Sequence, residues 1–380
     1  MAVVQNSRCC SLIFLNFVIV TLLLFVSIDA ESSSIVYEKK QPSVVIAFLV
    51  RNKAHTLPYF LTLLERLDYP KERISLWIRS DHNEDKTLEI LKKWLSSVES
   101  DYHSINAELL SSPPKRLKDE MGPAHWSASR FMHVIQLREE ALMSARQLWA
   151  EYLWFLDADV FITNHQTLQL LMEKDRLVVA PALKSDGLYS NFWCGMTDNF
   201  YYQRTDDYKP ILSRERVGCF HVPMVHSSVL MDLRMTASDN LTYVGSNIPD
   251  YEGPHDDIIT FALAANKSDI PLYVCNDHVY GFVMVPLEQT DELKQDFIQL
   301  TNLKLEVLVE NSPLPVSGLL SGYVSYPEPD MMAFDVVFTI NLRRRPERRR
   351  RMVDCFRELG VRSVVVDAVD GRLGAAAIQS

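Results

Sequence analysis

The stretch Tyr152-Leu153-Trp154-Phe155-Leu156-Asp157-Ala158-Asp159-Val160 decides the fold. Its continuous apolar run is typical of a strand in a parallel sheet that is covered on both faces. Two carboxylates separated by one small residue follow the run. Side chains two apart in extended backbone point the same way, so Asp157 and Asp159 can converge on one cation. They would lie at the carboxyl end of a strand, where open α/β sheets bind ligands.

This D-x-D pair has two interpretations. One is a Mn²⁺ or Mg²⁺ site that holds a nucleotide diphosphate, because such hard cations take oxygen ligands from few carboxylates and complete their shell with phosphates. The other is a polar turn after a core strand, since a D-x-D arises by chance roughly once in a chain of this length. The apolar strand before the pair adds weight to the metal interpretation without deciding between the two.

Length and composition set the class of protein. The chain has 380 residues, of which 47% are hydrophobic and 23% charged, and this predicts a globular protein of about two domains. The net charge of -10 argues against nucleic acid as a partner.

The first 30 residues resemble a secretory signal peptide. Arg8 precedes a mostly apolar run over residues 12–28, and the run is followed by Asp29-Ala30. We therefore predict cleavage after Ala30, with no stable membrane span in the mature protein. A signal anchor is the alternative, because the run approaches transmembrane length. Polar Asn16 and Thr21 within the run favour cleavage.

Entry into the secretory pathway affects how other residues are interpreted. Asn240 and Asn266 each begin an N-x-[ST] triplet and become candidate glycan acceptors. Outside the predicted signal the cysteines are Cys194, Cys219, Cys275 and Cys355. None of them forms a C-x-x-C pair, which argues against structural zinc. One or two disulfides are compatible with the sequence, which does not assign their pairing.

Strand and helix patterns alternate from the start of the ordered chain. Residues 43–50 and 74–78 predict strands, residues 55–67 a helix, and a further helix ends near Leu95. This order predicts a parallel sheet with right-handed crossovers. A long amphipathic helix over residues 129–149 then leads into the Asp157 strand. The chain has neither a G-x-G-x-x-G nor a G-x-x-x-x-G-K-[ST] motif, so dinucleotide and P-loop sites lose their main support.

Polar residues after these strands are candidate donor contacts. Arg51 and Asn52 follow the first strand, and Asp81 follows the second. Asp81 can accept hydrogen bonds from a base or ribose, or can instead form an Asx-turn or a helix cap, although Asp85 is the better placed cap. Farther along the chain, the aromatic and amide cluster around Asn191 and Trp193 predicts either a sugar platform or a packed aromatic subcore.

A second acidic centre is formed by Asp256 and Asp257 at the start of an apolar helix. Helix capping is the simple interpretation. The alternative is a general base that removes the acceptor hydroxyl proton. Adjacent helical residues point about 100° apart, so we assign the base to Asp257 and give Asp256 the cap or a donor-sugar contact. His278 is a candidate third metal ligand, although a lone histidine is more often structural.

From about residue 43 to residue 371 the chain resembles the procollagen galactosyltransferases of glycosyltransferase family 25, which include the relative cerebral endothelial cell adhesion molecule. The resemblance is carried, in chain order, by Arg51-Asn52-Lys53-Ala54-His55-Thr56-Leu57-Pro58, the segment from Asp81 to Thr87, His125-Trp126-Ser127, the Asp157–Asp159 strand, Asn191-Phe192-Trp193-Cys194-Gly195-Met196, Gly218-Cys219-Phe220, Val222-Pro223-Met224-Val225-His226-Ser227, Asp256-Asp257-Ile258-Ile259 and Val285-Pro286-Leu287. It implies a GT-A-like, Rossmann-type nucleotide-sugar-binding domain with a central, mostly parallel sheet. It further implies UDP-galactose as donor, Mn²⁺, hydroxylysine of collagen as acceptor, inversion at the anomeric carbon, and the endoplasmic reticulum lumen.

The predicted domain order is a signal peptide (1–30), the GT-A-like domain (42–310), a Pro-rich linker (311–333), and the start of a second α/β glycosyltransferase domain (334–380). Within the last part, residues 335–340, 348–359 and 361–366 predict strand, helix and strand. One such unit cannot bury its own core, and we therefore expect a truncated product. No KDEL-like retrieval signal ends the sequence. The basic run over residues 343–351 would suggest nuclear import or nucleic acid, but the signal peptide argues against both.

Two classes of function follow from the resemblance. The first is a metal-dependent galactosyltransferase, and the second is an inactive binding or adhesion protein on the same fold. The presence of Asp157, Asp159, Asp256 and Asp257 favours the enzyme. A glucosyltransferase of the lysyl hydroxylase type would differ only in donor and acceptor.

Overall fold

The computed structural model describes residues 40–112 and 114–371. The chain divides into two units, Met1–Gln41 and Pro42–Ser380, and the following description concerns the second unit. The predicted signal peptide lies outside the described residues. Among the residues that are described, no helix has both the length and the apolar character needed to cross a bilayer.

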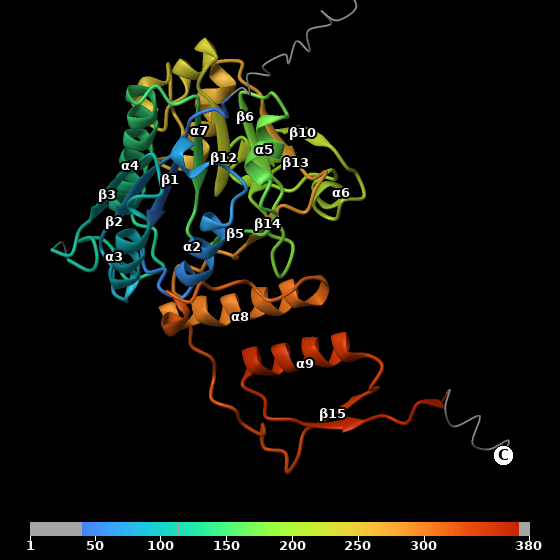
Figure 1. Cartoon of the computed structure of the whole chain (residues 1–380). Coiled ribbons are helices and arrows are strands. Elements are labelled where there is room, and N and C mark those ends of the chain that lie inside the picture. The colour runs from blue at the N-terminus through green and yellow to red at the C-terminus, as the bar shows by residue number, and fades with distance from the viewer. Residues whose placement is uncertain (1–39, 113, 372–380) are drawn as a thin grey trace, which may run out of the picture. The chain divides into compact units, whose positions relative to one another are not determined.

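An eight-stranded sheet forms the centre of the molecule, in the order β10-β13-β6-β12-β4-β1-β2-β3 (Figure 1). The strands that run in one direction are β1 (Val44–Val50), β2 (Ile74–Ser80), β3 (Ser104–Leu109), β4 (Tyr152–Leu156), β6 (Val178–Pro181) and β13 (Leu272–Cys275). Two strands are antiparallel to them, β12 (Ser228–Asp232) between β4 and β6, and β10 (Cys219–Val222) at the edge. The predicted α/β class with a central, mostly parallel sheet is confirmed.

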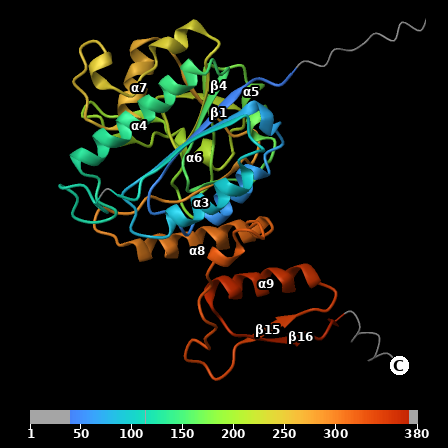
Figure 2. The ribbon, with the colours of Figure 1, turned by 60° about the vertical axis from the view of Figure 1, so that its left-hand side comes forward.

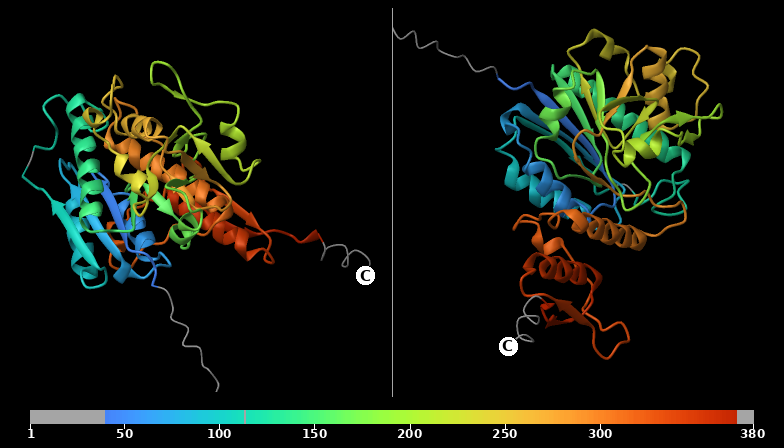
Figure 3. Two further views of the ribbon diagram at one scale, coloured as in Figure 1. Left: turned by 90° about the horizontal axis from the view of Figure 1, so that it is seen from above. Right: turned by 90° about the vertical axis from the view of Figure 1, so that its right-hand side faces the viewer.

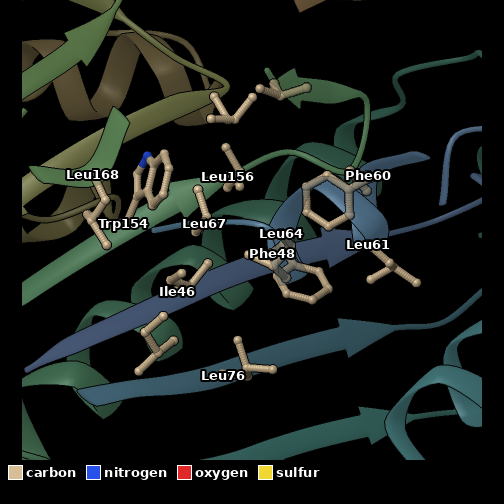
Figure 4. Packing of buried hydrophobic residues seen from close by; sticks show 14 of the residues in the cluster. Ile46, Phe48, Phe60, Leu61, Leu64, Leu67, Leu76, Trp154, Leu156 and Leu168 are labelled. Atoms are coloured by element: carbon tan, nitrogen blue, oxygen red, sulfur yellow. The ribbon is translucent and has the colours of Figure 1, made fainter. Parts of the chain in front are cut away.

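Both faces of this sheet are covered, which explains the continuous apolar strands. Helices α2 (Leu57–Glu65) and α3 (Thr87–Val98) pack on one face, and α4 (Ala128–Gln147) and α7 (Asp257–Lys267) pack on the other (Figure 2). Successive residues of β4 alternate between the two cores, so Trp154 faces the first pair of helices and Phe155 the second. Figure 4 shows this first core, in which Phe48 of β1 meets Phe60 of α2 with ring centroids 5.2 Å apart.

The predicted elements agree with the structure to within a few residues. Helix α4 begins one residue earlier than predicted, because the Ser127 hydroxyl accepts a hydrogen bond from the Arg130 backbone N–H. Strand β3 was not predicted. It lies at the edge of the sheet, is largely exposed and carries polar residues, so its sequence has no apolar pattern. Strands β10 and β12 and helix α8 (Leu293–Glu310) are further elements that the sequence patterns did not indicate.

One disulfide is present among the described residues. Cys219 of β10 and Cys275 of β13 lie opposite each other in antiparallel register and are bonded. Cys194 and Cys355 are free and half-buried. The bridge resolves the pairing that the sequence left open.

Part of the segment predicted as a Pro-rich linker packs against the core. Leu320 is fully buried and Leu314 is 7% exposed. The Ser317 backbone N–H donates to the Thr62 hydroxyl at 2.9 Å. This part of the connection is therefore held against the first domain by Leu314, Ser317 and Leu320.

A strand–helix–strand unit follows, as predicted, and appears in red in Figure 3. It consists of β15 (Phe338–Asn341), α9 (Pro346–Leu359) and β16 (Val364–Asp367), and its two strands are parallel. Lys304 of α8 forms a buried ion pair with Glu358 of α9. One face of the strand pair is uncovered, since Phe338 and Ile340 are 59% and 72% exposed.

Candidate active site

Polar residues from three neighbouring strands meet at the carboxyl edge of the sheet. Strands β2, β1 and β4 are adjacent and parallel, so the residues that follow each of them lie close together. Arg51, Asp81, Asp157 and Asp159 line one cavity there, together with residues of α4. Four of the residues singled out in the sequence are therefore brought to one place.

The D-x-D pair lies in the turn that follows β4, and not in extended backbone as expected from the sequence. Each of its carboxylates is paired with a cation of the protein itself. Asp157 Oδ1 accepts a hydrogen bond from Arg138 Nη2 at 3.1 Å. Asp159 Oδ2 lies 3.0 Å from Lys53 Nζ. The two carboxylate side chains are 28% and 25% exposed, so both remain accessible from the cavity.

Arg138 also connects this pair to the predicted general base. Its Nε donates to Asp257 Oδ2 at 2.6 Å, so one guanidinium joins carboxylates of β4 and α7. Burial raises the pKa of Asp157 and of Asp257, although Arg138 opposes both shifts. Burial acts to lower the pKa of Arg138, but the two carboxylates outweigh it and raise that pKa. Arg138 is therefore a permanent cation.

Sequence reasoning missed Arg138, although a signal was present. The apolar face of α4 includes Val134, Ala141 and Ala145, and Arg138 falls on the same face at helical spacing. Its guanidinium carbon lies 5.4 Å from the Phe155 ring and 5.9 Å from the Tyr243 ring. A charged residue on an otherwise apolar helix face indicates a buried partner of opposite charge.

Lys53 likewise pairs with two carboxylates. Its Nζ lies 3.0 Å from Asp159 Oδ2 and 3.0 Å from Asp296 Oδ2, and Asp296 belongs to the first turns of α8. His55 Nε2 lies 3.2 Å from the same Asp296 oxygen. Burial would raise the pKa of Asp296, but Lys53 and His55 outweigh it and lower the pKa to about 2.

On the β2 side of the cavity, Asp81 is bound to His133 of α4. The Asp81 Oδ2–His133 Nε2 distance is 2.7 Å. Burial acts to raise the pKa of Asp81, but the hydrogen bond with His133 outweighs it and the pKa falls, while the same bond raises the pKa of His133. Ligand atoms of Asp81, His82 and His133 lie within 4.8 Å of one another, close enough to hold a metal ion.

Arg51 and Asn52 hold the loop after β1. The Arg51 guanidinium donates to both oxygens of Glu120, at 2.7 and 2.8 Å. Asn52 has φ +56°, its backbone N–H donates to Asn83 Oδ1, and its own Oδ1 accepts from the Glu84 backbone. Its Nδ2 is buried and has no hydrogen-bond partner within residues 40–112 and 114–371.

Asn191 and Trp193 do not line this cavity. Asn191 is fully buried, accepts from the Leu183 backbone N–H at 3.0 Å and donates to the Pro181 carbonyl at 2.9 Å. Trp193 stacks on Tyr202 and Tyr208, with ring centroids 5.2 and 5.9 Å apart. Their contacts describe a packed aromatic subcore.

The remaining predicted site residues occupy separate places. Asp256 is the N-cap of α7, where its Oδ1 accepts from the backbone N–H groups of Ile258 and Ile259. His278 lies 3.4 Å from Asp277 and lines a different cavity from that of the D-x-D pair. Asn240 and Asn266, the predicted glycan acceptors, are both exposed.

The chemistry of the D-x-D site suits a hard divalent cation. Asp157 and Asp159 offer carboxylate oxygens on one accessible wall, and oxygen donors of this kind select Mn²⁺ or Mg²⁺. The internal cations Lys53 and Arg138 show that this wall attracts positive charge. The cluster of Asp81, His82 and His133 offers imidazole nitrogens and would suit a softer metal.

Comparison with known proteins gives consistent relatives. Residues 41–304 match the family model described as glycosyltransferase family 25, N-terminal domain. A glycosyltransferase 25 family member of Anopheles gambiae is 48% identical over 354 residues, which cover 92% of this chain and 60% of that protein. Procollagen galactosyltransferase 2 of Homo sapiens is 45% identical over 333 residues, which cover 88% of this chain and 53% of that protein. The chain thus spans somewhat more than half the length of these relatives.

A solved structure with partial similarity is the mannosyltransferase PcManGT from Pyrobaculum calidifontis in complex with GDP-Man and Mn²⁺. The identity is 12% and the TM-score 0.39, over 73% of this chain and 67% of that one. Similarity at this level supports no further argument about the site.

Proposed function

The chain belongs to glycosyltransferase family 25, and from this premise we propose that it is a metal-dependent hexosyltransferase that moves galactose from UDP-galactose to hydroxylysine of collagen with inversion. One observation carries the proposal. Asp157 of the D-x-D pair and Asp257, from distant parts of the chain, both accept a hydrogen bond from Arg138, beside the cavity that Asp157 and Asp159 line. The names of the relatives, which include procollagen galactosyltransferases, support the donor and acceptor.

The proposed roles correspond to the leaving group and the acceptor of a displacement reaction at the anomeric carbon. Asp157 and Asp159 would hold Mn²⁺ or Mg²⁺, which when bound supplies counter-charge for the diphosphate leaving group. Asp257 would take the proton of the acceptor hydroxyl as its oxygen bonds to the anomeric carbon. The bond from that carbon to the diphosphate breaks, and UDP leaves with the electron pair.

Asp257 is proposed as the general base although it does not line the D-x-D cavity and is ion-paired with Arg138. The carboxylate is 7% exposed on its side chain, and burial raises its pKa above the usual range of an aspartate. A base acts best when its pKa approaches the working pH. Asp256, the adjacent carboxylate, is occupied by the first backbone N–H groups of α7 and is left to support the helix.

The donor nucleoside would lie along the β1–β2 side of the cavity. We assign Asp81 to the base or ribose, because its position after β2 puts it beside the D-x-D wall. Arg51 and Asn52 would shape this part of the cavity through the loop after β1. Asn191, Trp193 and His278 are farther along the chain, and their contacts suit structural roles.

We further propose the endoplasmic reticulum lumen as the compartment. The Cys219–Cys275 bridge supports an oxidising environment, in which disulfides form and persist. The exposed triplets at Asn240 and Asn266 are accessible for glycosylation there. Glycosidase treatment of the secreted or luminal protein should reduce its mass if either asparagine carries a glycan.

The test is transfer from UDP-galactose to a hydroxylysine-containing collagen peptide, measured on this chain and on a full-length relative. Transfer should require Mn²⁺, disappear with a chelator, and collapse in Asp157→Ala. UDP binding that is equally strong with and without Mn²⁺ would contradict the assigned metal role. Collagen binding without transfer by either protein would favour the adhesion alternative.

A further inference from the structure

Each carboxylate of the D-x-D pair shares its internal cation with a second carboxylate from a later helix. Arg138 contacts Asp157 at 3.1 Å and Asp257 of α7 at 2.6 Å. Lys53 contacts Asp159 at 3.0 Å and Asp296 of α8 at 3.0 Å. The same arrangement therefore occurs twice around one candidate metal site.

A divalent cation on Asp157 and Asp159 would meet two protein cations already in place. Like charges repel most strongly where water is excluded, and Arg138 and Lys53 are 11% and 21% exposed. Removing one partner of a buried ion pair is strongly destabilising, because it leaves an uncompensated charge. Metal binding is compatible with these cations only if each keeps another carboxylate.

We propose that Asp257 and Asp296 are reserve partners that accept Arg138 and Lys53 when a divalent cation takes Asp157 and Asp159. The inference rests on the proposed metal role of the D-x-D pair. No side chain has to leave the site, since both reserve carboxylates already contact their cation. The reserve partners thereby make the metal-free and metal-bound states interchangeable without an unpaired buried charge.

The geometry of the reserve partners is fixed by the helices that carry them. Asp257 is the first residue of α7, which Asp256 caps. Asp296 follows a capping box formed by Glu292 and Gln295 at the start of α8. Helix N-termini favour negative charge, which supports the ionised form of both reserve carboxylates and opposes the burial that raises the pKa of Asp257.

The experiment measures the affinity for Mn²⁺ alone, by the electron paramagnetic resonance of free Mn²⁺, in variants checked for folding by circular dichroism. Asp296→Asn and Asp257→Asn should each weaken Mn²⁺ binding about tenfold, which corresponds to about 1.4 kcal/mol, although neither residue is a proposed ligand. Arg138→Gln should tighten binding, because it removes the competing charge. In the Arg138→Gln background, Asp257→Asn should have no further weakening effect.

The matched control is Arg146→Gln on the same helix. The Arg146 guanidinium donates to the backbone carbonyls of Ser238 and Leu241 and contacts no site carboxylate. Its replacement should leave Mn²⁺ affinity unchanged even if stability falls.

Two results would overturn the inference. One is unchanged Mn²⁺ affinity in both Asp296→Asn and Asp257→Asn. The other is an Asp257→Asn effect that persists without Arg138, since the carboxylate would then act through its own field. If the unaltered chain binds no Mn²⁺, or Asp157→Ala binds it equally well, the proposed function fails together with the inference. Mn²⁺ binding that needs Asp157 but ignores the reserve partners contradicts the inference alone.

Discussion

At the scale of single residues, two neighbouring carboxylates have different roles in the site. Asp256 and Asp257 are adjacent, yet one faces backbone N–H groups and the other faces Arg138. The difference follows from the helix boundary, because Asp256 is the N-cap with extended backbone (φ -139°, ψ 125°) and Asp257 is the first helical residue. The sequence supports this division of roles, and substitutions can test it.

Asp257→Asn should keep the shape of the site but remove the base, and transfer is measured at saturating Mn²⁺ because the same substitution is expected to weaken Mn²⁺ binding. We expect the transfer rate to fall by about 10²-fold or more, measured as kcat with a collagen peptide. Asp256→Asn is the matched control and should mainly affect stability, since a helix cap contributes about 1 kcal/mol. Near-normal transfer by Asp257→Asn with normal UDP binding would assign this carboxylate a structural role.

His226 provides a prediction about pH. It is 6% exposed, and burial and the charge of Arg138 lower its pKa from 6.5 to about 3. Below about pH 6.5, His226 is protonated in the unfolded chain but stays neutral in the folded chain. His226 therefore costs stability as pH falls from about 6.5 towards 3, by at most about 1.4 kcal/mol per pH unit.

The measurement is the midpoint of urea unfolding between pH 4 and 7. His226→Asn should flatten the acid side of this profile, and the same substitution at exposed His103 should leave its slope as it was. Parallel profiles for the unaltered chain and His226→Asn would show that another group controls the acid side.

At the scale of elements, the antiparallel edge of the sheet is fastened covalently. The Cys219–Cys275 bridge joins β10 to β13, and its cysteines are 56 residues apart in sequence. The bridge restricts the unfolded chain over that loop. The edge strand should therefore depend on the bridge more than the central strands do.

Replacing both bridge cysteines with alanine should reduce the free energy of unfolding by about 2–4 kcal/mol. Denaturant titration measures this loss, and Cys194→Ala, at a free thiol, is the control. Equal stability of the double variant and the unaltered chain would show that the bridge adds nothing.

At the scale of the whole molecule, the C-terminal strand–helix–strand unit contacts the first domain through a buried ion pair. Lys304 and Glu358 are 9% and 4% exposed, and one apolar face of β15 and β16 is open. Two strands and a helix bury too little surface to be stable alone. The unit should therefore fold only while attached.

Limited proteolysis should trim the C-terminal unit and leave a core that ends beyond Leu320. The cut cannot fall near Pro313 without exposing Leu314 and Leu320, which are buried against the first domain. Mass spectrometry of the resistant core gives its C-terminus. A resistant fragment that begins near Phe334 would show that the unit is an independent domain.

The sequence by itself determined the features that depend on neighbours along the chain. Alternation and apolar runs predicted β1, β2, β4 and the helices between them, because side-chain period follows directly from backbone geometry. Local capping preference likewise indicated Asp256 as a helix cap. Asp157 and Asp159 instead lie in a turn after β4, to which the side-chain period of a strand does not apply. Glycosyltransferase family 25 motifs added the expectation of donor and acceptor.

Only the tertiary structure decided which distant segments share a contact. Sheet order places β12 between β4 and β6 and brings Cys219 opposite Cys275, and no local pattern contains it. The packing of Leu320 is likewise a contact with a distant part of the core. Arg138 and Lys53 become part of the site for the same reason. Each joins carboxylates that are far apart in sequence, and such a contact forms only after the sheet has brought the ends of its strands to one edge.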